Sequence, residues 1–82
     1  MTPEEIKQKL TTIFREVFED DTIVVTDDMV ADHVENWDSL SNVLMIDKVE
    51  QAFNIKLKLK EVINLQNVGD LVKCIGNHIQ PQ

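Results

Sequence analysis

Residues 38–53 read DSLSNVLMIDKVEQAF. The segment opens on Asp38 and Ser39, two residue types that cap helix N-termini, and either side chain could be the cap. The apolar residues of the segment recur at helical spacing: Leu40, Val43, Leu44, Ile46, Val49 and Phe53. Asn54 follows, and asparagine tolerates the left-handed conformation that ends many helices. The stretch therefore predicts an amphipathic helix with a hydroxyl group at its first turn.

Upstream of this segment, a first helix is predicted near residues 3–18. Thr2 and Glu5 have the spacing of a capping box, and Pro3 suits the first helical position. One apolar stripe follows, made of Ile6, Leu10, Ile13, Phe14, Val17 and Phe18.

A long connection, residues 19–38, separates the two predicted helices. Connections of this length are uncommon in compact domains and are often functional or disordered. We expect this one to pack over the core through its apolar residues, which are Ile23, Val25, Met29, Val30 and Val34. Its acidic residues lack the alternate spacing, the central glycine and the final glutamate of a calcium-binding EF-hand loop.

The C-terminal third contains one ambiguous segment and one clear helix. Residues 55–60 alternate like a strand but have no evident pairing partner, so we interpret them as an extended connector. Residues 60–64 could form one short helical turn. Asn67 and Asp70 then mark the start of a last helix with its apolar residues on one face: Val68, Leu71, Val72, Ile75 and Ile79. The fold predicted for residues 1–82 is a single all-α domain, a small four-helix bundle with three main helices and one short one.

Composition restricts the class of function. The net charge of −7 argues against nucleic acid and anionic membranes as partners. No apolar run has the length of a membrane span and no signal peptide is evident, so we expect a cytoplasmic protein without membrane insertion. The charge is uneven: residues 1–38 hold 11 acids and 3 bases, whereas residues 39–82 hold 4 acids and 5 bases. The only basic cluster, Lys56, Lys58 and Lys60, is expected to form a solvated edge.

Few side chains suggest metal or redox chemistry. Cys74 is the only cysteine, so no internal disulfide can form, and we expect it to be partly buried. His33 and His78 are far apart in the sequence and are interpreted as surface residues, so no metal site is predicted. Trp37, directly before the Asp38–Ser39 pair, could be a lid over the core or a contact for a partner.

The chain resembles the acyl carrier proteins, with the peptidyl carriers as close relatives. The resemblance begins with Asp38-Ser39-Leu40 at the junction of loop and helix, and it runs from about Val25 to Ile79. It is carried further by the spacing of Val43, Ile46, Val49, Phe53, Ile55, Leu57, Val62, Leu65, Val68, Leu71 and Ile75.

This resemblance implies a carrier that is not itself an enzyme. The Ser39 hydroxyl, flanked by Asp38 and Leu40, would receive a 4′-phosphopantetheine arm from coenzyme A. A separate Mg²⁺-dependent phosphopantetheinyl transferase would catalyse that step. The thiol of the arm would carry acyl groups as thioesters between acyl-loading and acyl-transferring enzymes. We expect the protein to be a monomer.

Two positions depart from the pattern of the family. Asn36 stands where many members have glycine, although asparagine can adopt similar backbone angles. Leu44 stands where an acid is expected, so that Asp47 and Glu50 are the only acids on this helix after its first residue. We expect partners to dock on Leu40, Val43, Leu44, Asp47 and Glu50, although Leu44 could instead be part of the core.

Two alternatives remain open from the sequence. The protein could be a peptidyl or aminoacyl carrier, since fatty acyl, polyketide, aminoacyl and sugar-modifying acyl cargoes all use this scaffold. It could also be an unmodified helical interaction module in which Ser39 only caps a helix. A serine hydrolase is a poor alternative because no base and no oxyanion loop can be assigned.

Overall fold

The computed structural model describes residues 2–34 and 36–79. Along the chain it contains α1 (Pro3–Phe18), a 3₁₀ turn η1 (Ala31–His33), α2 (Ser39–Phe53), α3 (Leu59–Ile63) and α4 (Val68–Ile79). The described residues include no strand, which confirms the all-α prediction of three main helices and one short one. The short helix α3 begins one residue earlier than residues 60–64 suggested.

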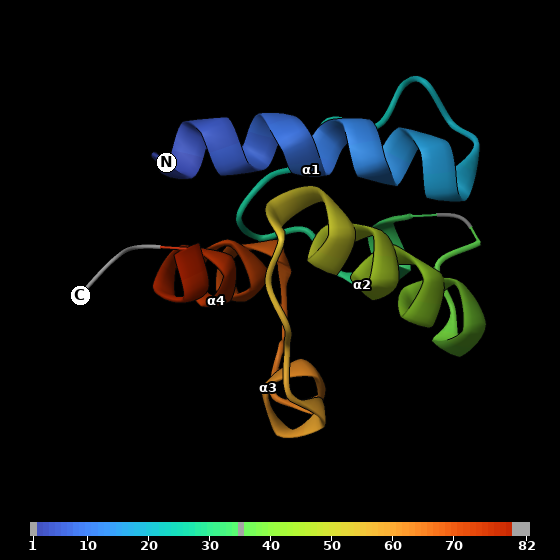
Figure 1. The fold of residues 1–82 in the computed structure, drawn as a ribbon. Helices are drawn as coiled ribbons and strands as arrows, with labels where there is room; N and C mark the ends of the chain where they lie inside the picture. The colour runs from blue at the N-terminus through green and yellow to red at the C-terminus, as the bar shows by residue number, and fades with distance from the viewer. Residues whose placement is uncertain (1, 35, 80–82) are drawn as a thin grey trace.

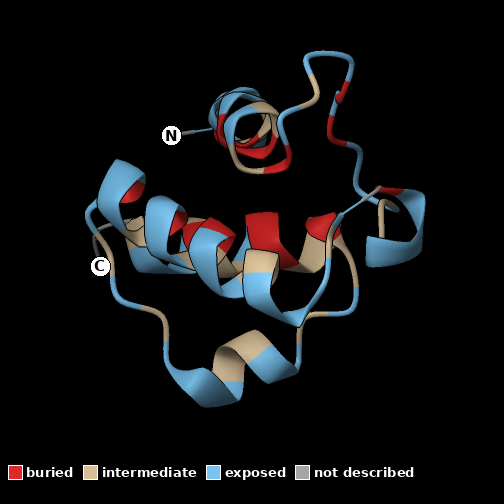
Figure 2. Cartoon of the chain, turned by 90° about the vertical axis from the view of Figure 1, so that its right-hand side faces the viewer, coloured by how far each residue is buried: buried red, intermediate tan, exposed pale blue. Residues whose placement is uncertain are grey.

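Helix α1 lies across the bundle and packs on both α2 and α4 (Figure 1). Its buried face points toward the other two long helices, whereas α3 lies at the far side of the molecule without a buried residue (Figure 2). The centre of the core consists of seven side chains with almost no exposure: Ile6, Leu10, Phe14, Met45, Val49, Val68 and Ile75. Among the described helices, none is long and apolar enough to cross a bilayer.

The N-terminus of α1 has the predicted capping box. The backbone N–H of Glu5 donates to Thr2 Oγ1 at 3.2 Å, and the backbone N–H of Thr2 donates to Glu5 Oε1 at 2.9 Å. These bonds satisfy backbone donors that have no partner inside the helix. The pKa of Glu5 is lowered because Thr2 donates to its carboxylate.

The long loop between α1 and α2 packs over the core, as predicted. Ile23, Val25 and Val34 are buried, while Met29 and Val30 are half-buried. The loop is also held through its backbone, because Arg15 Nε donates to the carbonyl of Ile23 at 2.8 Å.

The same loop supplies carbonyl groups to the start of α4. The N–H groups of Val68 and Gly69 donate to the carbonyls of Met29, at 2.9 Å, and Asp27, at 2.7 Å. Asn67 is the predicted cap, since its Oδ1 accepts the N–H of Asp70 at 2.9 Å. Three backbone N–H groups in the first turn of α4, which have no partner within the helix, are thereby hydrogen-bonded.

The segment between α2 and α3 is an extended connector, as predicted. Asn54 ends α2 in the left-handed conformation with φ of 56°. Ile55 and Leu57 are half-buried against the core, and the N–H of Leu57 donates to Glu50 Oε2 at 2.8 Å. This bond anchors the connector to α2.

Gly69 and Gly76 of α4 form a matched pair for testing the contact between loop and helix. A Cβ at position 69 would meet the carbonyl oxygen of Asp27 at 2.9 Å, whereas one at position 76 would meet only Ile6 Cδ1 at 3.8 Å. We expect Gly69→Ala to lower the free energy of unfolding by about 1–3 kcal/mol, as overpacking does. Gly76→Ala should leave it unchanged or raise it by up to about 1 kcal/mol. Urea denaturation would measure both, and equal effects would contradict the close approach at Gly69.

Candidate functional site

The N-terminus of α2 is closed by a reciprocal pair of hydrogen bonds. The N–H of Ser41 donates to Asp38 Oδ1 at 3.0 Å, and the N–H of Asp38 donates to Ser41 Oγ at 2.8 Å. Asp38 is therefore the cap, and Ser39 is the first residue inside the helix. The pKa of Asp38 is lowered, chiefly because the N–H of Ser41 donates to its carboxylate.

This arrangement leaves Ser39 exposed and chemically available. Within residues 2–34 and 36–79, no hydrogen bond involves the Ser39 hydroxyl, whereas the Ser41 hydroxyl donates to the carbonyl of Asn36 at 2.7 Å. Ser39 also lies at the positive end of the α2 dipole, beside N–H groups that have no partner within the helix. Such a position suits a phosphate ester.

The segment leading into the site is fixed by Asn36 and Trp37. Asn36 has a φ of 72°, the backbone conformation for which the sequence predicted that asparagine could replace glycine. The Trp37 ring packs edge-on against Phe14 with centroids 5.1 Å apart, and its Nε1–H donates to Asn42 Oδ1 at 3.0 Å. Trp37 is therefore a half-buried lid over the core, and it links α1 to the first turn of α2.

A cleft of about 400 Å³ opens beside Ser39 between α2, α3 and α4. Its wall combines residues of the site with apolar side chains, among them Trp37, Met45, Val62, Leu65, Val68 and Leu71. Asp38, Ser39 and Asn42 form the part of the wall at the start of α2. The cleft can therefore take an apolar group connected to the Ser39 hydroxyl.

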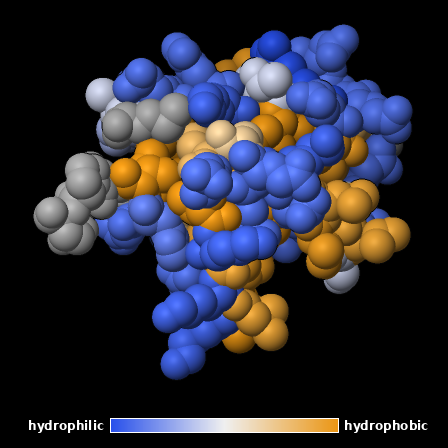
Figure 3. All heavy atoms as spheres, viewed as in Figure 1, coloured by the Kyte–Doolittle hydropathy of each residue, from blue (hydrophilic) through white to orange (hydrophobic). Residues whose placement is uncertain are grey.

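The predicted docking residues of α2 are largely exposed. Leu40, Val43 and Leu44 have exposed fractions of 75%, 64% and 55%, so the alternative that Leu44 belongs to the core is wrong. Hydrophobic atoms gather on the surface over the N-terminal half of α2 and over α3 (Figure 3). Asp47 is exposed. Glu50 is half-buried, and its Oε2 accepts the N–H of Leu57.

Two features of the structure were missed in the sequence. Met45 is buried and lines the cleft, although the apolar stripe predicted for α2 did not include it. Glu61, Cys74 and His78 also come together, with one possible ligand atom from each lying within 4.8 Å of the others. The spacing of Cys74 and His78, four residues apart on α4, was the available signal for this second group.

Comparison with known proteins gives the class to which this fold and site belong. The family model described as "Phosphopantetheine attachment site" matches residues 8–75. The chain therefore belongs to the family of phosphopantetheine-binding carrier domains. The cofactor of this family is 4′-phosphopantetheine, and its members are carriers, not enzymes.

A solved structure places the chain close to the acyl carrier proteins within that family. The chain is similar to the holo acyl carrier protein from Geobacter metallireducens, determined by solution NMR, with 42% sequence identity and a TM-score of 0.83. The match covers 88% of this chain and 83% of that protein. No curated protein sequence gives a significant match. The predicted resemblance, all-α fold and cofactor are confirmed.

Ser39 and Ser41 are the only serines of the chain, and the structure predicts that replacing them with alanine has unequal effects on stability. Ser39→Ala should change the free energy of unfolding by less than about 0.5 kcal/mol, as is usual for exposed side chains that form no hydrogen bond. Ser41→Ala should lower it by about 1 kcal/mol because hydrogen bonds to Asp38 and Asn36 are lost. Urea denaturation followed by circular dichroism would measure both. A loss for Ser39→Ala as large as that for Ser41→Ala would mean that Ser39 also caps the helix.

Proposed function

We propose that this protein is an acyl carrier whose 4′-phosphopantetheine arm is attached to Ser39, within a single carrier domain formed by residues 1–82. The observation that carries the proposal is the unengaged Ser39 hydroxyl at the start of α2, beside an apolar cleft. Asp38 and Leu40 flank the attachment point. The alternative in which Ser39 only caps a helix loses its support, because Asp38 is the cap.

The attachment reaction is a phosphoryl transfer. The Ser39 oxygen attacks the phosphorus that bears the pantetheine group of coenzyme A, a bond from oxygen to phosphorus forms, and the pyrophosphate P–O bond breaks. The leaving group is the adenosine bisphosphate part of coenzyme A, and the serine proton passes to a base of the transferase. The chain needs no catalytic base of its own. The resulting phosphodiester anion lies at the N-terminus of α2, where the helix dipole and free N–H groups stabilise it.

The cleft supports an acyl cargo. Its apolar wall of Met45, Val62 and Leu71 favours a hydrocarbon chain over a charged aminoacyl or peptidyl group. A volume of about 400 Å³ is in the range of small-molecule pockets. We place the protein in fatty acid or polyketide biosynthesis, as a cytoplasmic monomer. A peptidyl or aminoacyl carrier is the second candidate.

Partner enzymes are proposed to dock on the exposed face of α2. Leu40, Val43 and Leu44 supply an apolar surface next to Ser39, with Asp47 and Glu50 further along the helix. Because only two acids follow the first residue of this helix, docking depends more on apolar contact than on ion pairs. The partners would be the phosphopantetheinyl transferase and the acyl-loading and acyl-transferring enzymes.

Modification of Ser39 can be tested directly. The purified protein would be incubated with coenzyme A, Mg²⁺ and a broad-specificity phosphopantetheinyl transferase, and its intact mass measured. We expect the mass of one phosphopantetheinyl group to be added to the wild type and to Ser41→Ala, and none to be added to Ser39→Ala. An adduct that persists in Ser39→Ala, or none on the folded wild type, would refute the assignment.

The apolar docking surface gives a second prediction. Leu44→Asn should lower kcat/KM of the transferase for this protein at least about fivefold, since burial of a leucine side chain in an interface contributes about 1–3 kcal/mol. Its free energy of unfolding should stay nearly constant because Leu44 is 55% exposed. Val24→Asn is the matched control, since Val24 is an equally exposed apolar residue on the loop after α1. Equal rates for the two variants would argue against docking through Leu44.

A further inference from the structure

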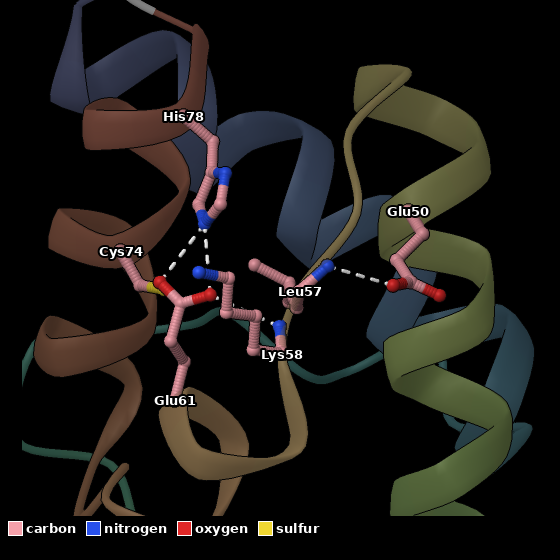
Figure 4. A network of polar contacts seen from close by, with 6 residues as sticks. All are labelled: Glu50, Leu57, Lys58, Glu61, Cys74 and His78. Carbon is pink, nitrogen blue, oxygen red and sulfur yellow. Dashed lines mark hydrogen bonds and ion pairs between the residues drawn. The ribbon is translucent and has the colours of Figure 1, made fainter.

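Helices α3 and α4 meet through a compact group of three side chains. Glu61 comes from α3, and Cys74 and His78 come from α4 and point toward it (Figure 4). His78 Nε2 lies 2.9 Å from Glu61 Oε2 and 3.1 Å from Oε1, and Cys74 Sγ lies 3.5 Å from Oε2. This group lies outside the wall of the cleft beside Ser39.

The donor atoms are those that zinc prefers. Thiolate sulfur, imidazole nitrogen and carboxylate oxygen are the three protein ligand types of Zn²⁺. Cys74 and His78 are four residues apart on one helix and therefore share a face. Tetrahedral zinc bonds of about 2.0–2.3 Å place ligand atoms about 3.3–3.6 Å from one another. The three atoms, already within 4.8 Å of each other, can reach that geometry through small side-chain rotations.

The carboxylate of Glu61 is already oriented for such a role. Its Oε1 accepts the backbone N–H of Lys58 at 3.0 Å, a bond that also caps α3, while Oε2 lies closest to Cys74 and His78. The pKa of Glu61 is lowered, first by the N–H of Lys58 and then by His78, which favours the anion. Ligating carboxylates in metalloproteins are commonly held by a second hydrogen bond of this kind.

We propose that Glu61, Cys74 and His78 form a binding site for Zn²⁺ or a chemically similar divalent cation, which links α3 to α4. The side chains of Glu61 and His78 are 33% and 27% exposed, so a water molecule can reach the fourth coordination position. The exposed side chain of Lys58 extends alongside the group (Figure 4) and can turn toward solvent when the cation binds.

The link matters because α3 has few other attachments. Helix α3 has five residues, none of them buried. Val62 is the residue of α3 that lines the cleft beside Ser39. Bound Zn²⁺ would replace the contact between His78 Nε2 and Glu61 with direct bonds from the cation to both helices, and a proton on Nε2 of the neutral imidazole would move to Nδ1 of the same ring. We expect the cation to hold α3 closed against α4 and thereby to limit opening of the cleft.

Binding has a defined proton balance. A cysteine thiol is mostly protonated near neutral pH. Formation of the bond from sulfur to Zn²⁺ therefore releases the thiol proton of Cys74 to the buffer. The difference in released protons between the wild type and Cys74→Ser reports the contribution of Cys74 independently of affinity.

The test is a titration of the full chain with Zn²⁺ near neutral pH by calorimetry in buffers of different ionisation enthalpy. We expect one site, release of one proton from Cys74, protection of Cys74 from alkylation and a rise in Tm, with no response to Mg²⁺. Loss of a residue that only orients a metal ligand costs about 10–100-fold in metal affinity. Loss of a ligand itself, in Cys74→Ser or His78→Gln, should therefore weaken binding at least about tenfold. Co²⁺ should give an absorption band from thiolate coordination that Cys74→Ser abolishes.

Matched controls separate this site from adventitious binding. His33→Gln removes the second histidine of the chain. Glu50→Gln alters a carboxylate that, like Glu61, accepts a backbone N–H of the connector. Both variants should bind Zn²⁺ like the wild type. The titration is repeated with apo and holo forms, because the arm of the holo form carries its own thiol. Binding that is unchanged in Cys74→Ser, or confined to the holo form, would overturn the proposal. Alkylation of wild-type Cys74 at an unchanged rate with saturating Zn²⁺ would overturn it as well, even if a variant failed to fold.

Discussion

The capping box between Asp38 and Ser41 is the interaction on which the site depends. It decides where α2 begins, and because Asp38 is the cap, Ser39 becomes the first helical residue. The hydroxyl of Ser39 is then left without a partner among the described residues, at the positive end of the helix. The hydroxyl of Ser41 continues the network to the carbonyl of Asn36, so the turn before the helix is fixed by the same few atoms.

Contacts with α1 and the long loop hold this turn in place. Trp37 lies against Phe14 and Phe18 on one side and donates to Asn42 on the other, which ties the first turn of α2 to the core. The loop that precedes Trp37 is itself held by the start of α4, whose N–H groups bind loop carbonyls. A loop of this length is thus ordered by pairing its backbone groups and burying three of its side chains, in agreement with the need to satisfy backbone hydrogen bonds.

The sequence predicted the helices well because their signals are local. Capping residues and apolar periodicity predicted α1, α2 and α4 to within a residue, and Ser39 is proposed as the attachment point from a resemblance across the chain. The buried face of α2 was harder to predict, since apolar residues occur on both sides of this helix. Its buried residues are Met45, Val49 and Phe53, while Leu40, Val43 and Leu44 face solvent. The meeting of Glu61 with His78, 17 residues away, depends on how α3 packs on α4, which no local pattern encodes.

The hydrogen bond from Ser41 to Asn36 has a further consequence for regioselectivity. Two serine hydroxyls lie within one helical turn, and an enzyme that approaches this turn could in principle esterify either of them. Among the described residues, the Ser39 hydroxyl has no hydrogen-bond partner, whereas the Ser41 hydroxyl donates to the carbonyl of Asn36 and accepts the N–H of Asp38. Under the proposed attachment at Ser39, the hydrogen bonds of Ser41 would help the chain itself to discriminate between the two alcohols. The transferase would then need no pocket that distinguishes two chemically identical side chains.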